Sequence, residues 1–444
     1  MDNTLNKMEM KVSNLFILLF GSVCAGCFGM EDMVGSSGPG LTLVMILVIP
    51  IIWAMPIALV CAEMGAAYPE QGGYYVWIKK SLGPFWGYCA AFWRTWIWYL
   101  NSGILIVLAM DYVVGFFNLD RAGYLIVCAV ILIGIAVINI IGLKAVSWMS
   151  ILFLIMIMVP FGLLVIFGVF HLEHNPMQPF FNPYESNTSN IAYAIVLGVW
   201  MYGAFESPAG YAGEISNFRK IFPKALGITV VAMTLTYFLP MIVGLSAVGN
   251  WELWGEAGGA NAITVVDLCE AVGGHALGVA MLISAMCSNI IQVNDNMAAT
   301  TRIPAIIAED GLAPKFFLKL HKTRKTPVGS IIFTCALAYV VICVGHFSVL
   351  IEFQSFVFFA TYIMLMVAII ASRVKQPDLE RPFRIPIGTL GLTLYAIPVF
   401  LICIYCIIFC SKAAAIGALI FGPAAPITYF IFKKLYGGPD KVKE

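Results

Sequence analysis

The chain has 444 residues, of which 61% are hydrophobic and 11% are charged, and its formal net charge is +1. Soluble domains carry about 25% charged residues, so this composition excludes an ordinary globular protein and predicts a chain that lies largely in lipid. Its basic residues are spread along the sequence rather than gathered on one segment, so nucleic-acid binding is not expected.

Apolar segments long enough to cross a bilayer follow one another along the chain. A membrane-spanning helix needs roughly 20 apolar residues. We therefore expect an all-α integral membrane protein with about twelve transmembrane helices in a single domain of residues 1–444. The polar residues 1–11 precede the first apolar segment, so no cleavable signal peptide is expected. The predicted spans lie near residues 13–36, 42–67, 84–117, 122–141, 144–170, 190–212, 222–248, 275–301, 327–345, 349–373, 390–410 and 413–433.

The loops between these spans alternate in their basic residues. If the N-terminus lies inside, every loop on that side carries Lys or Arg, from Lys11 through the cluster between Arg302 and Lys325 to Lys434. The loops on the other side hold almost none, and one of them, residues 249–270, is acidic. Because basic loops stay in the cytoplasm, we expect a multi-pass protein of a plasma or inner membrane with both termini cytoplasmic.

The sequence gives no indication of a metal site or of enzyme chemistry. Its twelve cysteines lie mostly in apolar segments, and the pair Cys24 and Cys27 has no second pair or histidine cluster beside it. No nucleophile–base pair lies within the spans. We therefore expect no catalytic residue, no metal and no cofactor.

Two spans contain residues that break helices in the middle of an apolar segment. Glycine and proline free backbone groups that lipid cannot satisfy, and paired interrupted helices in two halves of a hydrophobic chain indicate a transporter binding site. An ionisable residue at that depth is itself a functional hypothesis. The candidate substrate-binding residues at the two breaks are Ala25, Gly26, Cys27, Phe28 and Gly29 in the first, and Tyr202, Gly203, Ala204, Phe205 and Glu206 in the second.

Several motifs follow one another along nearly the whole chain. They are Ala62-Glu63-Met64-Gly65 with Tyr68-Pro69-Glu70-Gln71-Gly72-Gly73, Gly213-Glu214-Ile215-Ser216-Asn217, Ala308-Glu309-Asp310-Gly311, and Arg381-Pro382-Phe383-Arg384-Ile385-Pro386. Together they resemble one family, the amino acid–polyamine–organocation (APC) permeases. Within it, residues 28–32, Phe-Gly-Met-Glu-Asp, most resemble the branch of polyamine-uptake and L-type amino acid transporter-like proteins.

The resemblance implies a fold and a mechanism. It implies a five-plus-five inverted repeat, with repeat one at about 13–170, repeat two at about 190–373 and trailing helices at about 390–433. The substrate would lie between discontinuous helices one and six. Transport would proceed by alternating access, coupled to protons, to sodium or to exchange.

The resemblance also implies roles for particular residues of this sequence. Glu206 matches an acid linked to proton sensing in exchangers and to amine binding in polyamine transporters, and Trp200 matches a gating tryptophan. Asn101 on helix three stands where plant relatives have Asp, so it is a further substrate-binding candidate. Burial favours the protonated form of a carboxylate, and an arriving cation would expel that proton, so Glu206 is also the candidate for proton coupling. Hydroxyls of Ser284 and Ser288 would serve a sodium site.

Other acidic residues admit more than one interpretation. Glu31 and Asp32 follow the first break. They would attract an amine if they point inward, or cap the outer half of the helix if they face the vestibule. At the cytoplasmic end, Glu63 is expected to pair with Arg302 as a closing latch.

The sequence therefore predicts a secondary transporter of amino acids or polyamine-like amines, coupled to protons or exchanging substrates. Its partners would be a small-molecule substrate, H⁺ and membrane lipid, with Na⁺ and the oligomeric state left open. One alternative is a permease for neutral or aromatic amino acids in which Glu206 is structural. A non-transporting amino acid sensor with the same fold is the other.

Overall fold

The computed structural model describes residues 9–24, 26–117, 120–184, 188–255, 262–344, 346–409 and 411–441. These residues form helices and no β-strand, which confirms the predicted all-α class. The helices are α1 (Val12–Val23), α2 (Glu31–Ser37), α3 (Pro39–Ile49), α4 (Met55–Ala67), α5 (Tyr74–Leu82), α6 (Pro84–Phe117), α7 (Arg121–Ile141), α8 (Leu143–Gly168), α9 (Thr188–Met201), η3 (Ser207–Glu214), α10 (Phe218–Val248), α11 (Val265–Gly273), α12 (His275–Thr300), α13 (Arg302–Glu309), α14 (Val328–Val344), α15 (Phe347–Lys375), α16 (Thr389–Ile408), α17 (Lys412–Tyr436) and α18 (Gly438–Lys441).

The long helices match the predicted spans closely. In the described part of the chain, 9 helical segments are long and apolar enough to cross a membrane, and shorter apolar helices cover Val12–Val23, Asn190–Met201 and Val328–Val344. Two of these short helices are parts of the spans that were expected to be discontinuous.

The predicted span 42–67 is α3 and α4, joined without a gap by a π-helical turn at Pro50–Ala54. Pro50 lacks an amide hydrogen, which favours such a local rearrangement of the helical bonds.

Both expected breaks are present. The first span stops at Val23 and resumes as α2 at Glu31, and the sixth stops at Met201 and resumes at Ser207 as the short 3₁₀-helix η3. Pro208 is the second residue of η3, where its missing N–H is tolerated. Discontinuous first and sixth helices are therefore confirmed.

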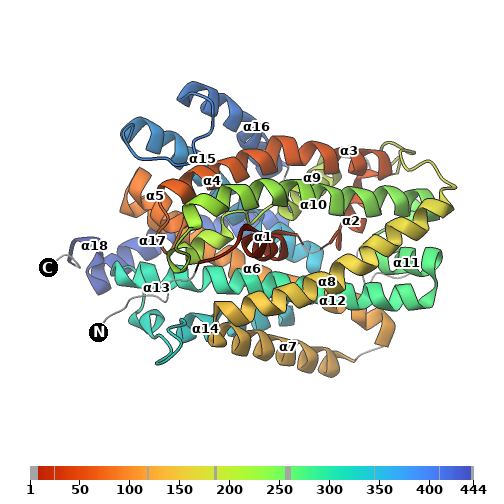
Figure 1. Cartoon of the computed structure of the whole chain (residues 1–444), viewed down its shortest axis with the longest axis horizontal. Coiled ribbons are helices and arrows are strands. Elements are labelled where there is room, and N and C mark those ends of the chain that lie inside the picture. The colour runs from red at the N-terminus through yellow and green to blue at the C-terminus, as the bar shows by residue number, and fades with distance from the viewer. Residues whose placement is uncertain are drawn as a thin grey trace.

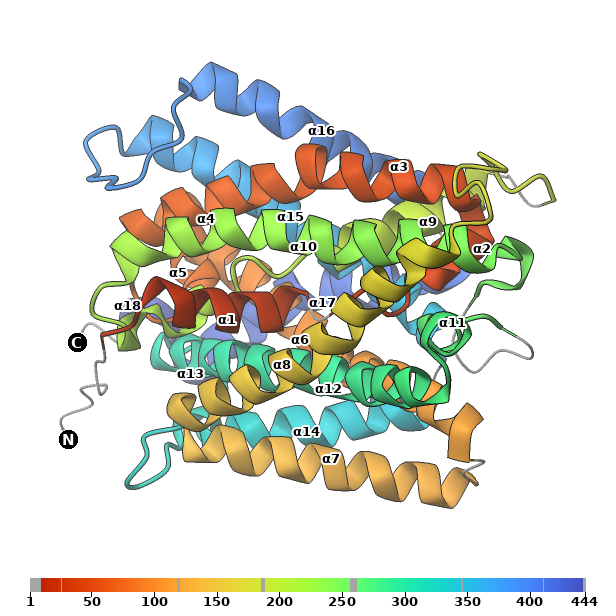
Figure 2. The same cartoon turned by 45° about the vertical axis from the view of Figure 1, so that its right-hand side comes forward.

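The helices run side by side along the long axis of the molecule (Figures 1 and 2). α2 and α11 lie at one end, and α5, α13 and α18 lie at the other. α7 and α14 form one flank and α16 the opposite flank, with α1 and α6 between them. In an apolar 18-residue stretch of α6, 89% of the residues are buried inside the protein, whereas in α17 the share is 22%. α6 is thus a core helix, and α17 presents an apolar surface suited to lipid.

Candidate substrate site between the broken helices

The first break is an extended segment whose shape depends on glycine. Gly26 and Gly29 have φ angles of 112° and 86°, a region that other L-residues rarely adopt. A Cβ atom on Gly26 would lie 2.4 Å from the ring of Phe161, so the backbone can approach α8 this closely only without a side chain. The amide of Gly29 donates to the Tyr112 hydroxyl at 3.2 Å. Ala25, predicted as part of this site, lies outside the described residues.

Tyrosines from neighbouring helices satisfy the backbone of the second break. Ala204 has a φ of 73° and donates its amide hydrogen to the Tyr362 hydroxyl at 2.8 Å. The Tyr237 hydroxyl donates to the carbonyl of Met201, the last residue of α9, at 3.1 Å. Tyr202 is buried, and its hydroxyl donates to the carbonyl of Ile46 on α3 at 3.0 Å. The bonds from Tyr237 and Tyr362 satisfy backbone groups that the break leaves without helical partners and that lipid could not satisfy.

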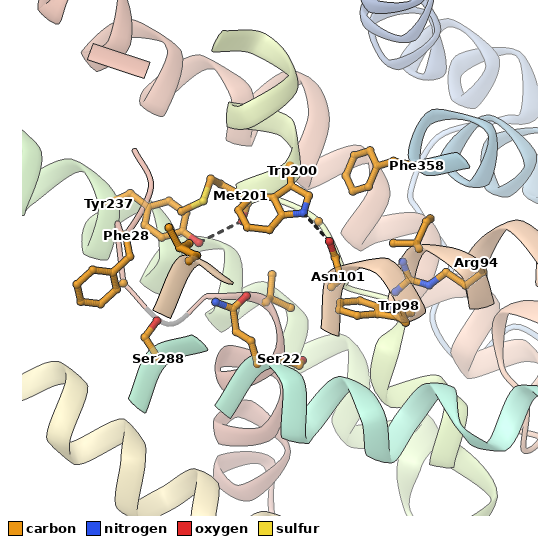
Figure 3. Close-up of a pocket in the computed structure, with 17 residues that line it drawn as sticks. Ser22, Phe28, Arg94, Trp98, Asn101, Trp200, Met201, Tyr237, Ser288 and Phe358 are labelled. Atoms are coloured by element: carbon orange, nitrogen blue, oxygen red, sulfur yellow. Dashed lines mark hydrogen bonds between the residues drawn. The ribbon is translucent and has the colours of Figure 1, made fainter. Parts of the chain in front are cut away.

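The two breaks enclose one small cavity (Figure 3). Its volume is about 20 Å³, enough for a single water molecule, whereas ligand pockets commonly measure about 300–1,000 Å³. The site is therefore closed around its centre in this conformation. The lining residues are Ser22, Val23, Gly26, Phe28, Arg94, Ile97, Trp98, Asn101, Leu108, Trp200, Met201, Gly203, Ala204, Tyr237, Ser288, Gln292 and Phe358.

The predicted site residues divide into two groups. One group lines the cavity, and the other is buried just behind it. The lining group is Gly26, Phe28, Asn101, Trp200, Gly203 and Ala204, and the second group is Cys27, Gly29, Tyr202, Phe205 and Glu206.

Asn101 connects helix three to two other walls of the cavity. Its Oδ1 accepts from Trp200 Nε1 at 3.2 Å, as Figure 3 shows, and from Gln354 Nε2 at 2.7 Å. The Trp200 ring also meets Phe347 edge to face, with ring centroids 5.9 Å apart. Because Trp200 is held by a side chain that lines the cavity, a substrate contacting Asn101 would compete directly for the bond that fixes the tryptophan.

The charged centre of the site is an ion pair between Arg94 on α6 and Glu206 in the second break. Their side chains are only 2% and 1% exposed. Arg94 also donates to Ser207 Oγ at 3.1 Å, and its guanidinium lies 4.7 Å from the centre of the Trp98 ring. Apart from Arg94, the Glu206 carboxylate has no hydrogen-bond partner among the described residues. Arg94 faces the cavity, and Glu206 lies behind it.

A single amide on α12 joins the two broken helices. Asn296 Nδ2 donates to the carbonyl of Ser22 in α1 at 2.7 Å, and its Oδ1 accepts from Ser207 Oγ in η3 at 2.7 Å. Ser207 is also the partner of Arg94. The ion pair, α1 and η3 thus share one hydrogen-bond network.

Glu31 and Asp32 do not face the cavity. Glu31 is buried and accepts from the Tyr112 hydroxyl at 2.8 Å and from the Val265 amide at 3.0 Å. Its carboxylate therefore caps the first turn of α11. Asp32 accepts from the Tyr193 hydroxyl. Of the two interpretations left open by the sequence, the one in which these acids point into the site does not describe this conformation.

The expected latch between Glu63 and Arg302 is wrong. Glu63 pairs with Arg373 at 2.5 Å and with Arg381 at 3.2 Å. Arg302 instead pairs with Glu214 at 2.5 Å, because α13 packs against η3. Two separate ion-pair groups therefore lie outside the cavity at the end of the molecule that carries α5 and α13.

Sequence reasoning missed the contribution of α15. Gln354, Phe358 and Tyr362 recur every fourth residue, which places them on one face of that helix. Gln354 bonds to Asn101, Phe358 lines the cavity and Tyr362 bonds to the second break. The sequence did hold a sign of this contribution, because a glutamine and a tyrosine lie on the same face of an apolar span.

An all-helical bundle with two broken helices around one buried polar cavity is the architecture of a membrane transporter. The chain matches the family described as amino acid permease over residues 10–431 and belongs to it. That family lies within the APC superfamily, as the sequence motifs predicted, and its members are transporters, not enzymes.

Named relatives extend over most of the chain. It is 29% identical to a probable polyamine transporter of Arabidopsis thaliana, covering 91% of this chain and 80% of the relative. It is 30% identical to the polyamine transporter PUT1 of Oryza sativa subsp. japonica, covering 86% and 71%. It is 26% identical to the large neutral amino acids transporter small subunit 2 of Rattus norvegicus, covering 84% and 71%.

Proposed function

We propose that this protein is a secondary transporter that carries amino acids or polyamine-like amines across a plasma or inner membrane by alternating access. One observation supports this proposal most strongly: both helix breaks line one closed cavity, and the Arg94–Glu206 pair lies beside it. The alternating basic loops support a topology with both termini in the cytoplasm. Two inverted repeats, at about 13–170 and 190–373, would place one break in each.

Several features of the cavity suit an amine. The rings of Phe28, Trp98 and Trp200 line it, and aromatic faces attract ammonium groups. Asn101 Oδ1 offers a hydrogen-bond acceptor on the same wall. The polyamine transporters among the relatives support this choice of substrate class.

Glu206 offers a means of coupling. Because Arg94 is the one partner of its carboxylate among the described residues, an added proton would leave the Arg94 charge uncompensated beside the cavity. That charge would repel a cationic substrate, so proton and substrate would bind in alternation. For sodium coupling, Ser288 lines the cavity, and Ser284 lies one helical turn away on α12.

A second candidate is a permease for neutral amino acids. The cavity-lining residues include no carboxylate. Glu206 lies behind Arg94, and the carboxylates of Glu31 and Asp32 are bonded to residues outside the cavity. In that case the ion pair would be structural. The relative named as a large neutral amino acids transporter subunit supports this candidate.

Counterflow uptake by the purified protein in proteoliposomes tests both candidates. Labelled putrescine, arginine and leucine are compared for the unaltered protein, for Glu206→Gln and for Glu252→Gln, a matched substitution of an exposed residue. Uptake of putrescine or arginine that is lost only in Glu206→Gln supports the coupled amine transporter. Leucine uptake that survives Glu206→Gln supports the neutral permease, and absence of all three activities argues against transport of these solutes.

A further inference from the structure

A second buried carboxylate, Asp295 on α12, lies apart from the cavity-lining residues. It is 2% exposed, and its Oδ1 lies 2.6 Å from Ser150 Oγ on α8. Asn294 Nδ2 donates to the same oxygen at 3.1 Å. Asn294 is oriented by Asn139 of α7, whose amide donates to Asn294 Oδ1 at 2.9 Å. Three helices thus meet at this carboxyl group.

The single hydrogen atom of the Ser150 hydroxyl bears on the protonation state of this group. Ser150 Oγ lies 2.8 Å from the Val146 carbonyl and 2.6 Å from Asp295 Oδ1. A hydroxyl has one hydrogen to donate, and a carbonyl oxygen can only accept. Ser150 can therefore donate to Asp295 or to Val146, but not fully to both. Both contacts are hydrogen bonds when Asp295 is neutral and donates its own hydrogen to Ser150.

The other oxygen of Asp295 supports the same assignment. Oδ2 is buried and has no hydrogen-bond partner within the described ranges. An ionised carboxylate in that position would carry charge on an oxygen with no compensating donor, which costs far more than burying a neutral acid. The neutral form removes most of this penalty.

No charged side chain on the packed elements compensates Asp295 within the described chain. α1 carries none, and the charged ends of α7, α8 and α12 are Arg121, Lys144 and His275, all exposed. Near the centre, Arg94 of α6 pairs with Glu206 of the second break, and Arg302 of α13 pairs with Glu214 of η3. The other charged groups on the packed elements are acids, which cannot compensate a carboxylate: Asp111 of α6, Asp267 and Glu270 of α11, and Glu309 of α13.

The inner half of the broken first helix covers this site. A Cβ atom on Gly21 of α1 would lie 2.6 Å from Asp295 Oδ2, so the helix packs on the carboxyl group only because residue 21 is glycine. α1 ends at Val23 and is separated from α2 by the first break, so it can move without the outer half. Its displacement would admit water to Asp295.

We propose that Asp295 is a proton-binding site of the transport cycle, distinct from Glu206, that holds its proton while α1 covers it. When α1 moves away, the O–H bond of the carboxyl group breaks, the proton passes to cytoplasmic water and the electron pair stays on the carboxylate. The reverse step reloads the site before α1 returns. This role in transport rests on the proposed function, whereas the protonated state of Asp295 does not.

Infrared difference spectroscopy of the purified protein tests the protonated state without transport. The carbonyl stretch of a protonated carboxylic acid should be present at neutral pH and lost in Asp295→Asn but not in Glu252→Gln. Ser150→Ala, which removes the acceptor while keeping the acid, should shift that band rather than abolish it. An identical band in the unaltered protein and in Asp295→Asn would overturn the assignment, as would an unshifted band in Ser150→Ala.

Proteoliposomes carrying a pH-sensitive dye test the role in transport. Asp295→Asn mimics the neutral acid, so counterflow should persist while accumulation driven by a proton gradient falls to the level of simple equilibration. Gradient-driven accumulation that equals the unaltered protein would overturn the role while leaving the proposed function intact. If the unaltered protein shows no counterflow, the proposed function fails, and the infrared result alone decides the state of Asp295.

Discussion

Arg94 of α6 and Glu206 of the second break form an ion pair that is nearly sealed from water, with side chains 2% and 1% exposed. Arg94 reaches the pair from a continuous core helix, whereas Glu206 lies on backbone that is not helical. The pair therefore fixes the most irregular part of the sixth span to the most buried helix. Any movement of the second break must either carry Arg94 along or separate the two charges.

Removing one member of this pair should destabilise the protein strongly. Breaking a buried pair leaves an uncompensated charge and costs about 3–5 kcal/mol. We expect Arg94→Met and Glu206→Gln each to lower the thermal unfolding midpoint in detergent. The double variant should recover most of that loss, because neither charge remains buried. A double variant that unfolds below both single variants would contradict this account.

Substituting Asn101→Asp should shift substrate preference towards cations. The new carboxylate would keep the acceptor for Trp200 and Gln354 while adding a negative charge to the cavity wall. A gain of about 1.4 kcal/mol in binding a cation corresponds to a tenfold change in affinity. We therefore expect about a tenfold rise in putrescine uptake relative to leucine at subsaturating concentrations. An unchanged ratio would show that substrates do not reach Asn101.

Gly26→Ala should abolish uptake even where the protein still folds. The added methyl would meet the Phe161 ring at 2.4 Å, on backbone with a φ of 112° that disfavours alanine. Gly227→Ala is the matched control, since its methyl meets nothing within 4 Å and Gly227 lies within α10. Alanine in place of a mid-helix glycine should stabilise that helix by about 0.5–1 kcal/mol. Equal uptake by the two variants would mean that the first break tolerates side chains.

Cysteine labelling should establish which side of the membrane α14 reaches. Cys343 is exposed near the end of α14. With cytoplasmic termini it faces outward, so an impermeant maleimide should label it in right-side-out vesicles, and Cys343→Ser should remove that label. Cys269 of α11 is on the same side but buried, and burial raises the pKa of its thiol to about 12, so the reactive thiolate is scarce at neutral pH. Labelling of Cys343 only in inside-out vesicles would contradict the predicted topology and place both termini outside.

The spans were predictable because each is a long apolar run that ends at glycine or at polar residues. The predicted span 84–117 coincides with α6, and 122–141 differs from α7 by one residue at its start. The breaks were predictable too, since Gly26, Gly29 and Gly203 interrupt otherwise apolar segments. The short helices α5 and α11 were not predicted, because nine-residue segments of mixed polarity carry a weak periodic signal.

The partners of charged residues could not be predicted in the same way. The partner of Arg94 depends on where α6 crosses the second break, and no pattern along the sequence identifies Glu206 as that partner. Glu63 was assigned to Arg302, whereas the packing of α15 against α4 brings Arg373 to it instead. Spacing along one helix identifies which residues share a face, but the choice of partner depends on how separate helices pack.

The two hydrogen bonds that Asn296 makes to the broken helices have a mechanical consequence. Since one rigid side chain links the carbonyl of Ser22 to the hydroxyl of Ser207, α1 and η3 cannot separate from α12 independently without losing a buried bond. An opening that moves both elements away from α12, towards the end that carries α5 and α13, would therefore break both bonds. This amide would resist that opening together with the Arg302–Glu214 pair, which ties α13 to η3, and the strength of these contacts would help to set how long a bound solute stays enclosed.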